Sequence, residues 1–405
     1  MLYICEGGGE YAMISSSSFR YHVGIAGAGA FAEFLAGALA PLPSFHLAAV
    51  AGRTDEKRQR VIDAYRRRQA QAGDVREYRE AEQLIVDPHV DIVILTTPPH
   101  LHAPLAERAL EEGKHVLLEK PGGLTAEALR ANIQLAARQN RALAVNLVLR
   151  YHPLAEAVKQ LIHRALLGPV DYASLHNAAH RVAKGHWFWD ERRSGGILIE
   201  HGVHFFEVGR DWFGEAVSAH GFALQETDGT RPRVGATVIH EGNGRRIPVH
   251  YYHGFTMDPA ASESTHWDIH TKRGRIVLDG WIPTQLSVSG LVTDEEAACI
   301  DAWLDAIPTN PSADAIEQLQ QAADRLLPPT EPSAAPRRPY ERTVVLSDRH
   351  GWYEAIAQTR FLDFCRLIEN PSWRILVTAE DAAADLALAE ACTVTDKAVD
   401  PLDIR

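Results

Sequence analysis

The chain has 405 residues, of which 46% are hydrophobic and 23% charged, which is typical of a globular protein with two or three domains. A formal net charge of −12 without any concentrated basic stretch argues against nucleic acid as a partner, and no apolar run reaches the roughly 18 residues that a membrane span needs. The four cysteines form no C-x-x-C pair, which favours a reduced, cytoplasmic setting.

The first part of the chain alternates short apolar strands with helices. Residues 1–20 are rich in glycine and serine and lack the pattern of a signal peptide, so we expect a disordered lead-in. Beyond them, the alternation predicts parallel βαβ units and therefore a Rossmann doubly wound parallel sheet over residues 21–150. The predicted elements are a strand, glycine turn and helix over 22–40, a strand over 45–52, a helix over 55–71, a strand over 90–97, a helix over 103–113, a strand over 115–119, a helix over 125–140 with Thr125 as its N-cap, and a strand over 141–149.

Residues 151–405 show a different pattern, which predicts a second domain for substrate binding and oligomerisation. Helices over 152–168 and 195–214 flank a strand over 169–179, and further strands follow with little helix between them. This order predicts a C-terminal α/β domain with a large open, mostly antiparallel sheet. An insertion is expected at about 294–345, helical at first and ending in a proline-rich loop. The further strands are expected at 217–224, 235–241, 246–255, 265–272 and 274–280, and two final helices at about 348–369 and 378–397.

The glycine turn after the first strand has the spacing of a dinucleotide site. Gly27, Gly29 and Ala32 follow the pattern G-x-G-x-x-A, with a strand before it and a helix after it. The first glycine permits a tight turn, and the second lets the backbone approach a pyrophosphate at the helix N-terminus. We therefore expect the cofactor to contact Gly27, Gly29, Ala30 and Phe31.

The end of the second strand bears on the choice between NAD and NADP. An acidic residue there would bind both ribose hydroxyls, but the sequence has Gly52-Arg53-Thr54. Arg53 and Thr54 are suited to a 2′-phosphate, so the pattern favours NADP over NAD. The alternative is that Arg53 stacks on adenine or lies in solvent. Asp55 is expected to be the N-cap of the next helix.

Two clusters lie at the carboxyl ends of predicted parallel strands, where ligands bind in such sheets. His100 and His102 follow one strand, and their spacing raises the alternative of a metal, but a loop that edges the cofactor fits the flanking prolines better. Glu119 and Lys120 follow the next strand, just before Pro121. Lys120 is a candidate for polarising a substrate oxygen, and the alternative is a structural Lys120–Glu119 ion pair.

A third cluster lies on the predicted helix over 195–214. Glu200 and His204 are four residues apart and share one face of a helix, so the carboxylate can orient the imidazole for acid/base chemistry. Two alternatives remain open. Glu200, His201 and His204 could bind a metal, or His204 could be a core histidine. No third ligand set with recognisable spacing accompanies them, and no metal is expected.

Together these motifs resemble those of the Gfo/Idh/MocA oxidoreductases, the family of glucose–fructose oxidoreductase and inositol 2-dehydrogenase. The similar stretches are "GIAGAGAFA", "TTPPHLHAPLAERALEEGKHVLLEKPGGLT" and "SGGILIEHGVHFFEV". The resemblance implies a Rossmann domain followed by an α/β domain whose open sheet serves a homodimer or homotetramer. It also implies that Thr97, Pro98 and His102 line the nicotinamide side and that Glu119 lies near the cofactor.

The resemblance implies a mechanism as well. Lys120 matches the catalytic lysine of the family, while Glu200 stands where the family commonly has aspartate, four residues before the histidine. The implied reaction is NAD(P)-dependent hydride transfer to or from a CH–OH carbon of a sugar, cyclitol or sugar derivative. His204 would move the hydroxyl proton, Lys120 would stabilise the oxyanion, and Glu200 would orient His204 or bind a neighbouring hydroxyl.

Substrate contacts are expected from the segment that precedes this helix. Trp187 and Trp189 can stack on a sugar face, although core or oligomer packing is an equal alternative. Asp190 and Arg192 can bind hydroxyl groups, and Arg192 a carboxylate. Weaker candidates at the domain junction are Arg150 and Tyr151.

Two other functional classes remain open from the sequence. Similar proteins include NAD-dependent glycosidases, which oxidise their substrate transiently. The other class is a non-catalytic NADP-binding sensor, against which the presence of both Lys120 and His204 argues.

Overall fold

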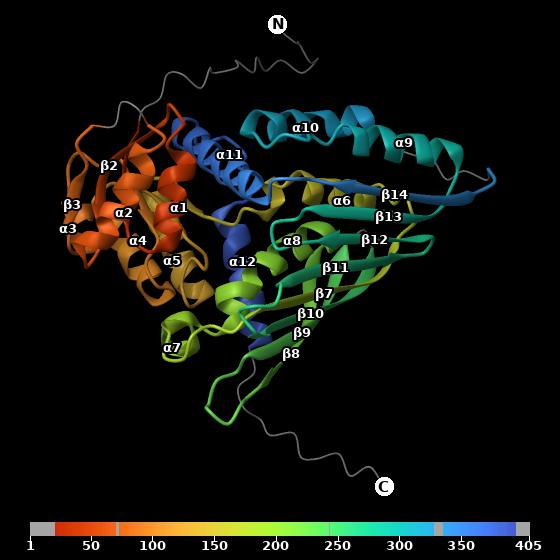
Figure 1. The fold of residues 1–405 in the computed structure, drawn as a ribbon, viewed down its shortest axis with the longest axis horizontal. Helices are drawn as coiled ribbons and strands as arrows, with labels where there is room; N and C mark the ends of the chain where they lie inside the picture. Colours follow the sequence, from red (N-terminus) through yellow and green to blue (C-terminus); the bar gives the residue numbers. More distant parts are fainter. Residues whose placement is uncertain (1–20, 70–72, 243, 328–334, 394–405) are drawn as a thin grey trace, which may run out of the picture.

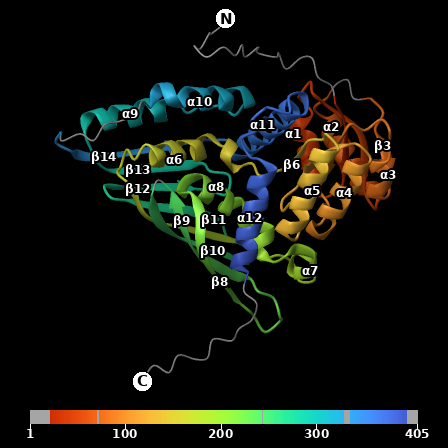
Figure 2. The same ribbon diagram turned by 180° about the vertical axis from the view of Figure 1, so that it is seen from behind.

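The computed structural model describes residues 21–69, 73–242, 244–327 and 335–393. The expected lead-in over 1–20 and most of the proline-rich loop lie outside these residues. Two sheets stand side by side, with helices α11 (Arg349–Glu369) and α12 (Ala379–Cys392) between them (Figure 1). The view from behind shows the same arrangement (Figure 2). Within the described part of the chain, no helix is long and apolar enough to cross a bilayer.

The first sheet confirms the predicted Rossmann fold. Its strands are β1 (Tyr21–Ala26), β2 (Phe45–Ala51), β3 (Arg76–Tyr78), β4 (Ile92–Leu95), β5 (His115–Leu118) and β6 (Leu143–Val145). All pair in parallel, in the order β3-β2-β1-β4-β5-β6. Every residue of β4 is buried, as its continuous apolar run predicts for a strand covered on both faces. The helices of this unit are α1 (Ala30–Leu39), α2 (Asp55–Arg66), α3 (Ala81–Ile85), α4 (His102–Glu111) and α5 (Ala126–Arg138).

The second sheet has eight described strands and is mostly antiparallel, as predicted. They are β7 (Val170–His180), β8 (Glu215–Leu224), β9 (Arg233–Gly242), β10 (Arg245–Met257), β11 (Ser264–Thr271), β12 (Gly274–Asp279), β13 (Gln285–Val292) and β14 (Arg338–Val345). Their order is β14-β13-β12-β11-β7-β10-β9-β8, and β7 and β10 run parallel. Strands β13 and β14 were not predicted. Strand β14 lies inside the expected insertion, so this segment leaves the sheet and returns to its edge.

One face of the second sheet is covered by helices. Helices α6 (Pro153–His163), α8 (Val203–Phe213), α9 (Asp294–Asp305) and α12 contact the strands directly, and α10 (Ala313–Leu326) packs on α6, α9 and α11. Burial alternates along β7, as expected for a strand with one covered face. The helical layer therefore separates this sheet from the Rossmann unit.

Helix α11 joins the two halves of the molecule. Its Phe361 and Phe364 are buried in the same core as Phe45 of β2, with the Phe45 and Phe361 rings 5.6 Å apart. The fully buried Arg360 donates a 2.6 Å hydrogen bond to the Val145 carbonyl at the end of β6. A C-terminal helix therefore completes the core of the N-terminal sheet and fixes the junction where the candidate site lies.

The N-cap residues expected for two helices, α5 and α2, can be compared with the structure. The Thr125 side chain accepts a hydrogen bond from the Ala128 N–H, so the predicted N-cap of α5 is confirmed. The expectation for Asp55 was wrong, because Thr54 occupies the N-cap position of α2. Asp55 is instead the first helical residue and pairs with Arg58 at 2.5 Å.

Candidate active site

An open cavity of about 360 Å³ lies between the two sheets. One wall is formed by the loops after β4, β5 and β6, at the carboxyl ends of the parallel strands. The other wall is formed by the segment before and within α8, by β10 and by the turn after β12. The position is the one at which open parallel sheets bind ligands, and the size suits a small organic molecule.

The glycine turn leads into an uncapped helix N-terminus beside this cavity. Gly27 has a φ of +112°, and a Cβ there would lie 2.6 Å from Thr96 Oγ1, so only glycine fits. Gly29 occupies the N-cap position of α1 without a side-chain cap, and Gly29 and Ala30 are exposed. Phe31 lines the cavity. An uncapped helix N-terminus in a glycine turn fits the pyrophosphate of a dinucleotide.

Two arginines lie near the end of β2, Arg53 in the following loop and Arg58 on α2, and their surroundings differ. Arg58 is held by the Gly52 carbonyl at 2.6 Å and by Asp55 and Glu77. Arg53 is exposed beside the exposed Thr54 and has no ion-pair partner among the described residues. Arg53 is therefore the arginine available to a ligand here.

Lys120 is held by a single residue of the opposite wall. Its Nζ donates to Glu200 Oε1 at 2.7 Å and to the Glu200 carbonyl oxygen at 2.6 Å. Glu200 lies in a π-helical turn, Leu198–Gly202, directly before α8. Such a turn widens the helix and takes a carbonyl out of the i→i+4 ladder, which is how a backbone oxygen becomes available to a side chain. The ion pair thus joins the two halves of the cavity.

Two glycines allow the chain to enter this turn. Gly195 and Gly196 have φ values of +81° and +87°. A Cβ at Gly195 would lie 2.5 Å from Ile199 Cγ2, so the segment folds back on itself closely. The expected single helix over 195–214 is therefore a glycine-led π-helical turn followed by α8.

Glu119 does not pair with Lys120, so the structural ion pair considered above is not formed. The Glu119 carboxyl is buried and accepts a hydrogen bond from Asn146 Nδ2 at 2.5 Å. Burial raises the pKa of Glu119 to about 8, although Asn146 and Lys120 oppose the shift. The group is therefore mainly protonated at neutral pH and adds no full charge to the cavity.

His204 reaches the cavity without a carboxylate partner, contrary to the expectation that Glu200 orients it. Its Nδ1 is buried and has no hydrogen-bond partner among the described residues, whereas Glu200 is bound to Lys120. The Trp281 ring, 4.5 Å away and edge-on, holds the imidazole instead. Burial, and secondly the charge of Lys120, hold the pKa of His204 well below its ordinary value. His204 is a neutral imidazole near pH 7, and a neutral imidazole can accept a proton.

His201 lies beside His204, with ring centroids 6.2 Å apart, and also lines the cavity. His253 of β10 lies behind it, 5.4 Å away and fully buried. Among the residues that the structure describes, no group of three or more His, Cys, Asp or Glu side chains is arranged to hold a metal.

His102 is a buried link between two loops. Its Nδ1 lies 2.6 Å from the Pro121 carbonyl oxygen and its Nε2 lies 2.6 Å from the Thr97 carbonyl oxygen. Only an imidazolium could donate to both, yet burial lowers the pKa of His102 to about 4. The neutral ring therefore donates to one carbonyl at a time. Thr97 and His102 line the cavity, whereas Pro99, and not the expected Pro98, contributes the proline there.

The expected substrate contacts divide into one that lines the cavity and five that do not. Trp187 lines it, while Asp190 caps α7 (Glu191–Ser194) and pairs with Arg192. The Arg192 side chain is 91% exposed. Asp190 and Arg192 therefore lie on the surface, because the chain turns between Trp187 and α7.

Arg150 and Tyr151 are structural residues at the junction. Arg150 forms an ion pair with the buried Glu207 and lies 3.6 Å from Asp211. The Tyr151 hydroxyl donates to Asp363 at 2.7 Å, and Tyr151 is only 2% exposed. Neither residue lies where the expected substrate contact would need it, because the partners of the two side chains come from α8 and α11.

Several cavity residues were not expected from the sequence, among them Thr96, Val148 and the four that follow. Asn146 follows β6 and binds Glu119; Phe255 and Trp281 come from the second sheet, and Tyr353 from α11. The predicted strand over 141–149 placed Asn146 inside the strand, whereas the observed strand ends at Val145, so the strand-end rule would have found Asn146 only with the correct boundary. The three aromatic residues had no local signal, since tertiary packing alone brings them here.

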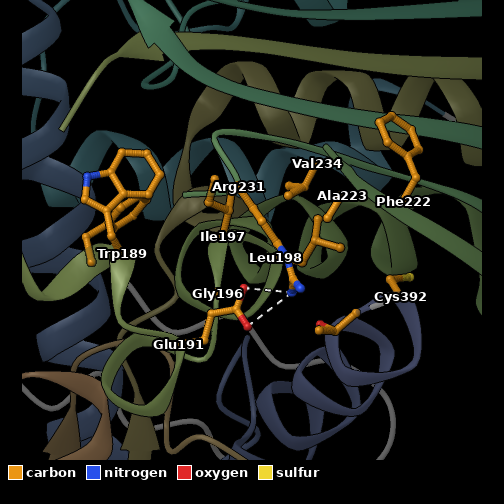
Figure 3. Close-up of a pocket in the computed structure, with 12 residues that line it drawn as sticks. Trp189, Glu191, Gly196, Ile197, Leu198, Phe222, Ala223, Arg231, Val234 and Cys392 are labelled. Atoms are coloured by element: carbon orange, nitrogen blue, oxygen red, sulfur yellow. Dashed lines mark hydrogen bonds and ion pairs between the residues drawn. The ribbon is translucent and has the colours of Figure 1, made fainter. Parts of the chain in front are cut away.

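A second crevice lies away from this chemistry, between α7, the β8–β9 pair and the end of α12 (Figure 3). Its Glu191 pairs with Arg231 at 3.2 Å. Burial raises the pKa of the Cys392 thiol to about 12, so the thiol is unreactive. Trp189 lines this crevice and not the cavity, and its Nε1 donates to the Val182 carbonyl. The crevice offers no reactive group.

Two family models match the chain on both sides of the junction. The model described as "Oxidoreductase family, NAD-binding Rossmann fold" matches residues 21–147, and that of the GFO/IDH/MocA C-terminal domain matches residues 155–277. The chain belongs to the Gfo/Idh/MocA family. Family membership explains why the glycine turn, the Lys120 loop and the helix of His204 occur together in one chain.

Solved structures are similar to most of this architecture, and curated relatives match a smaller part of the chain. Inositol 2-dehydrogenase of Rhizobium meliloti (strain 1021) is 30% identical over 172 residues, which are 42% of this chain and 51% of that protein. The chain spans about half the length of the curated relatives it matches. Levoglucosan dehydrogenase, solved with NADH and L-sorbose, aligns with a TM-score of 0.68 at 17% identity and covers 92% of this chain and 96% of that one.

Biliverdin reductase of Synechocystis sp. PCC 6803, solved with biliverdin and NADP+, aligns with a TM-score of 0.64 at 19% identity, over 92% of this chain and 98% of that one. At these identities both structures show the fold alone. Structures of this fold hold either NADH or NADP+, so the fold does not decide the cofactor.

Proposed function

We propose that this chain is an NAD(P)-dependent oxidoreductase that transfers a hydride between nicotinamide and a CH–OH or carbonyl carbon of a sugar, cyclitol or sugar derivative. One observation carries the proposal. Lys120 from the Rossmann unit and His204 from the second unit line the same cavity, at the carboxyl ends of the parallel strands.

The residues beside the cavity suit a dinucleotide. The backbone of Gly27, Gly29, Ala30 and Phe31 would hold the pyrophosphate, and the buried hydroxyl of Thr97 has no partner among the described residues. A bound nicotinamide supplies the hydride acceptor or donor. Arg53 and Thr54 favour NADP, because an unpaired arginine can bind a 2′-phosphate.

Two side chains would handle charge on the substrate oxygen. Lys120 has three donors, of which two are used by Glu200, so one remains for an oxygen of the substrate. Its ammonium group would stabilise the oxyanion that develops as the hydroxyl loses its proton. His204, neutral and without a carboxylate partner, would accept that proton and return it in the reverse direction. Glu200 would keep the ammonium group of Lys120 aimed at the substrate.

The first test is cofactor binding followed by turnover. We expect NADP(H) to raise the melting temperature more than NAD(H), and a neutral sugar or cyclitol to change the absorbance of the nicotinamide. No stabilisation by either cofactor would contradict the proposal. Cofactor binding without turnover of any sugar or cyclitol would instead favour the sensor.

Arg53→Ala tests the cofactor preference by itself. Loss of a charge-assisted bond should weaken NADP(H) binding by roughly ten- to a hundredfold and leave NAD(H) unchanged. Arg60→Ala is the control, because Arg60 is also exposed on α2 and lies 3.8 Å from Glu56. Equal losses for both cofactors in Arg53→Ala would contradict the role of Arg53.

A further inference from the structure

The charges of the groups that line the cavity balance one another. Lys120 and Glu200 are paired at 2.7 Å, with each side chain 15% exposed. Glu119 is mainly protonated at neutral pH, for the reason given above. No arginine lines the cavity within the described ranges. An anionic group of a substrate therefore meets no unpaired cation there, and a cationic group meets no unpaired carboxylate.

Two imidazoles are among the polar groups that remain in the cavity, beside the Thr97 hydroxyl assigned above to the cofactor. His204 Nδ1 and His201 Nε2 are buried without a partner, and neither imidazole forms a hydrogen bond with any residue that the structure describes. The second nitrogen of each ring, Nε2 of His204 and Nδ1 of His201, is not among the buried atoms, and both residues line the cavity. Two imidazole nitrogens on rings 6.2 Å apart therefore face the same space.

Both imidazoles are neutral near pH 7. Burial lowers the pKa of His201 to about 3, and the charge of Lys120 acts in the same direction. A neutral imidazole has one N–H donor and one lone pair. Its best partner is a group that can both accept and donate, and a hydroxyl is the simplest such group. A carboxylate or phosphate can only accept at neutral pH, and an ammonium can only donate.

Aromatic rings hold the two imidazoles in place. Trp281 lies 4.5 Å from the His204 ring and 5.7 Å from the His201 ring, and Phe255 lies 5.1 Å from His201. Trp187 lines the same cavity. Such a wall fits the C–H face of a saturated ring and leaves its hydroxyl groups to the imidazoles.

We propose that the substrate of this site is an uncharged polyol and that His201 determines specificity, by binding a hydroxyl group on a carbon next to the reacting one. The proposal rests on the proposed function, since it places the reacting carbon between Lys120 and His204. It assigns His201 a role separate from proton transfer: His204 acts on the reacting oxygen and His201 on its neighbour. Removing the imidazole of His201 should cost affinity and selectivity more than the chemical step.

Charge preference is the first test. Initial rates are measured with cofactor at saturation on neutral aldoses and cyclitols, and on the matching uronic acids and amino sugars. We expect kcat/KM for the neutral compound to exceed that of its charged counterpart by roughly ten- to a hundredfold, because a charged group enters the site without a counterion. A uronic acid or amino sugar that is turned over as well as its neutral counterpart would overturn the proposal while leaving the proposed function intact.

The role of His201 is tested with the best neutral substrate and its monodeoxy analogues. In the unaltered protein, one deoxy analogue beside the reacting carbon should lose roughly ten- to a hundredfold in kcat/KM. His201→Phe should raise KM for the parent sugar by a similar factor, with a smaller change in kcat, and should abolish the preference for parent over that analogue. His201→Asn, which keeps a donor and an acceptor, should restore part of it.

His253→Phe is the matched control, because His253 is also buried and contacts the His201 ring but does not line the cavity. It should keep the preference for the parent sugar, even if the melting temperature changes. The assignment would be overturned if His201→Phe kept the ratio of kcat/KM between the parent sugar and its deoxy analogue. It would also be overturned if His253→Phe lost this preference to the same extent as His201→Phe. Failure of the proposed function looks different: no cofactor stabilisation, and no turnover of any sugar by the unaltered protein.

Discussion

Two buried polar clusters lie along one stretch of chain, the π-helical turn and α8, and they differ in how their charges are partnered. On the cavity side, Lys120 has one carboxylate, and the imidazoles have unpartnered nitrogens. The other cluster holds two arginines that are surrounded by carboxylates. Arg150 pairs with Glu207, Asp211 and Asp381, and Arg210 with Asp385, Glu215 and Asp381.

Burial acts on the two clusters in opposite directions and for the same reason. It raises the pKa values of the Glu207 and Asp385 carboxyls and lowers those of His201 and His204, because burial disfavours the charged form of any group. The arginine cluster is closed by ion pairs, although Arg150 Nε, both Glu207 carboxyl oxygens and Asp385 Oδ2 have no hydrogen-bond partner among the described residues. None of these three residues lines the cavity, whereas His201 and His204 do. Access to the cavity, more than polarity or unfilled hydrogen-bonding capacity, distinguishes the candidate site from the structural cluster.

Of the variants that compare the two clusters, Lys120→Met is expected to have the largest effect on activity. Lys120 is the only lysine or arginine among the described residues that line the cavity. Removing it should lower kcat/KM by roughly a hundred- to a thousandfold, because the oxyanion loses its donor. Cofactor affinity, measured by titration, should change little. Lys159→Met is the control, since Lys159 pairs with Asp211 in the arginine cluster and should leave kcat/KM unchanged. Equal activity in both variants would remove the functional distinction between the clusters.

Arg150→Met should act on stability instead of chemistry. Removing one partner from a buried ion pair leaves uncompensated carboxylates, which costs about 3 kcal/mol of the free energy of unfolding. Denaturant titration measures this loss, and KM of the folded protein should stay the same. A large rise in KM at unchanged stability would return Arg150 to the substrate site, as the sequence suggested.

Glu200→Gln should have an intermediate effect on activity. The amide keeps a hydrogen bond to Lys120 but loses the charge, and the Glu200 carbonyl still holds the ammonium. We expect kcat to fall by about tenfold while KM changes less, because a charge-assisted bond is replaced by a neutral one. Glu200→Asp should retain most of the activity if a carboxylate is what is needed. An unchanged kcat in Glu200→Gln would mean that the backbone contact alone positions Lys120.

The ionisation of Glu119 should make the stability of the folded protein, measured by its melting temperature, depend on pH. Its folded pKa of about 8 lies above its ordinary value of 4.5, so the folded state keeps a proton that the unfolded chain releases. This contribution is fully present below about pH 4.5 and is lost as pH rises towards 8. Glu119→Gln should therefore show a smaller fall in melting temperature between pH 6 and pH 8 than the unaltered protein. Parallel melting curves for the two proteins would contradict the protonated state of Glu119.

The smallest effect is expected for Arg192→Ala. Its side chain is exposed and pairs only with Asp190 among the described residues, so stability should change by less than about 0.5 kcal/mol and KM not at all. Trp187→Ala, from the same loop, should raise KM severalfold because Trp187 lines the cavity. Loss of substrate affinity in Arg192→Ala would place the surface pair in the site.

Local sequence patterns predicted the fold class, because the spacing of hydrophobic residues along a strand or helix reflects which of its faces are buried. The β-branched run over 90–97 could only be a covered strand, and β4 is buried throughout. Strands β13 and β14 were missed, since β14 lies beyond the helices of the expected insertion and pairs only through tertiary contact. The i, i+4 relation of Glu200 and His204 did not give the expected contact, because the π-helical turn changes the helical register between them.

The sequence by itself determined the glycine turn, the strand ends that carry Glu119 and Lys120, and the segment that carries His204, because each depends on residues near one another in the chain. Only the tertiary structure decided which polar residues have partners. Arg150, Tyr151 and Arg192 are as polar as Lys120, yet the first two are bound by residues from α8 and α11 and the third lies in solvent. Whether a charged side chain is free to meet a ligand depends on partners distant in sequence, and only folding brings these together.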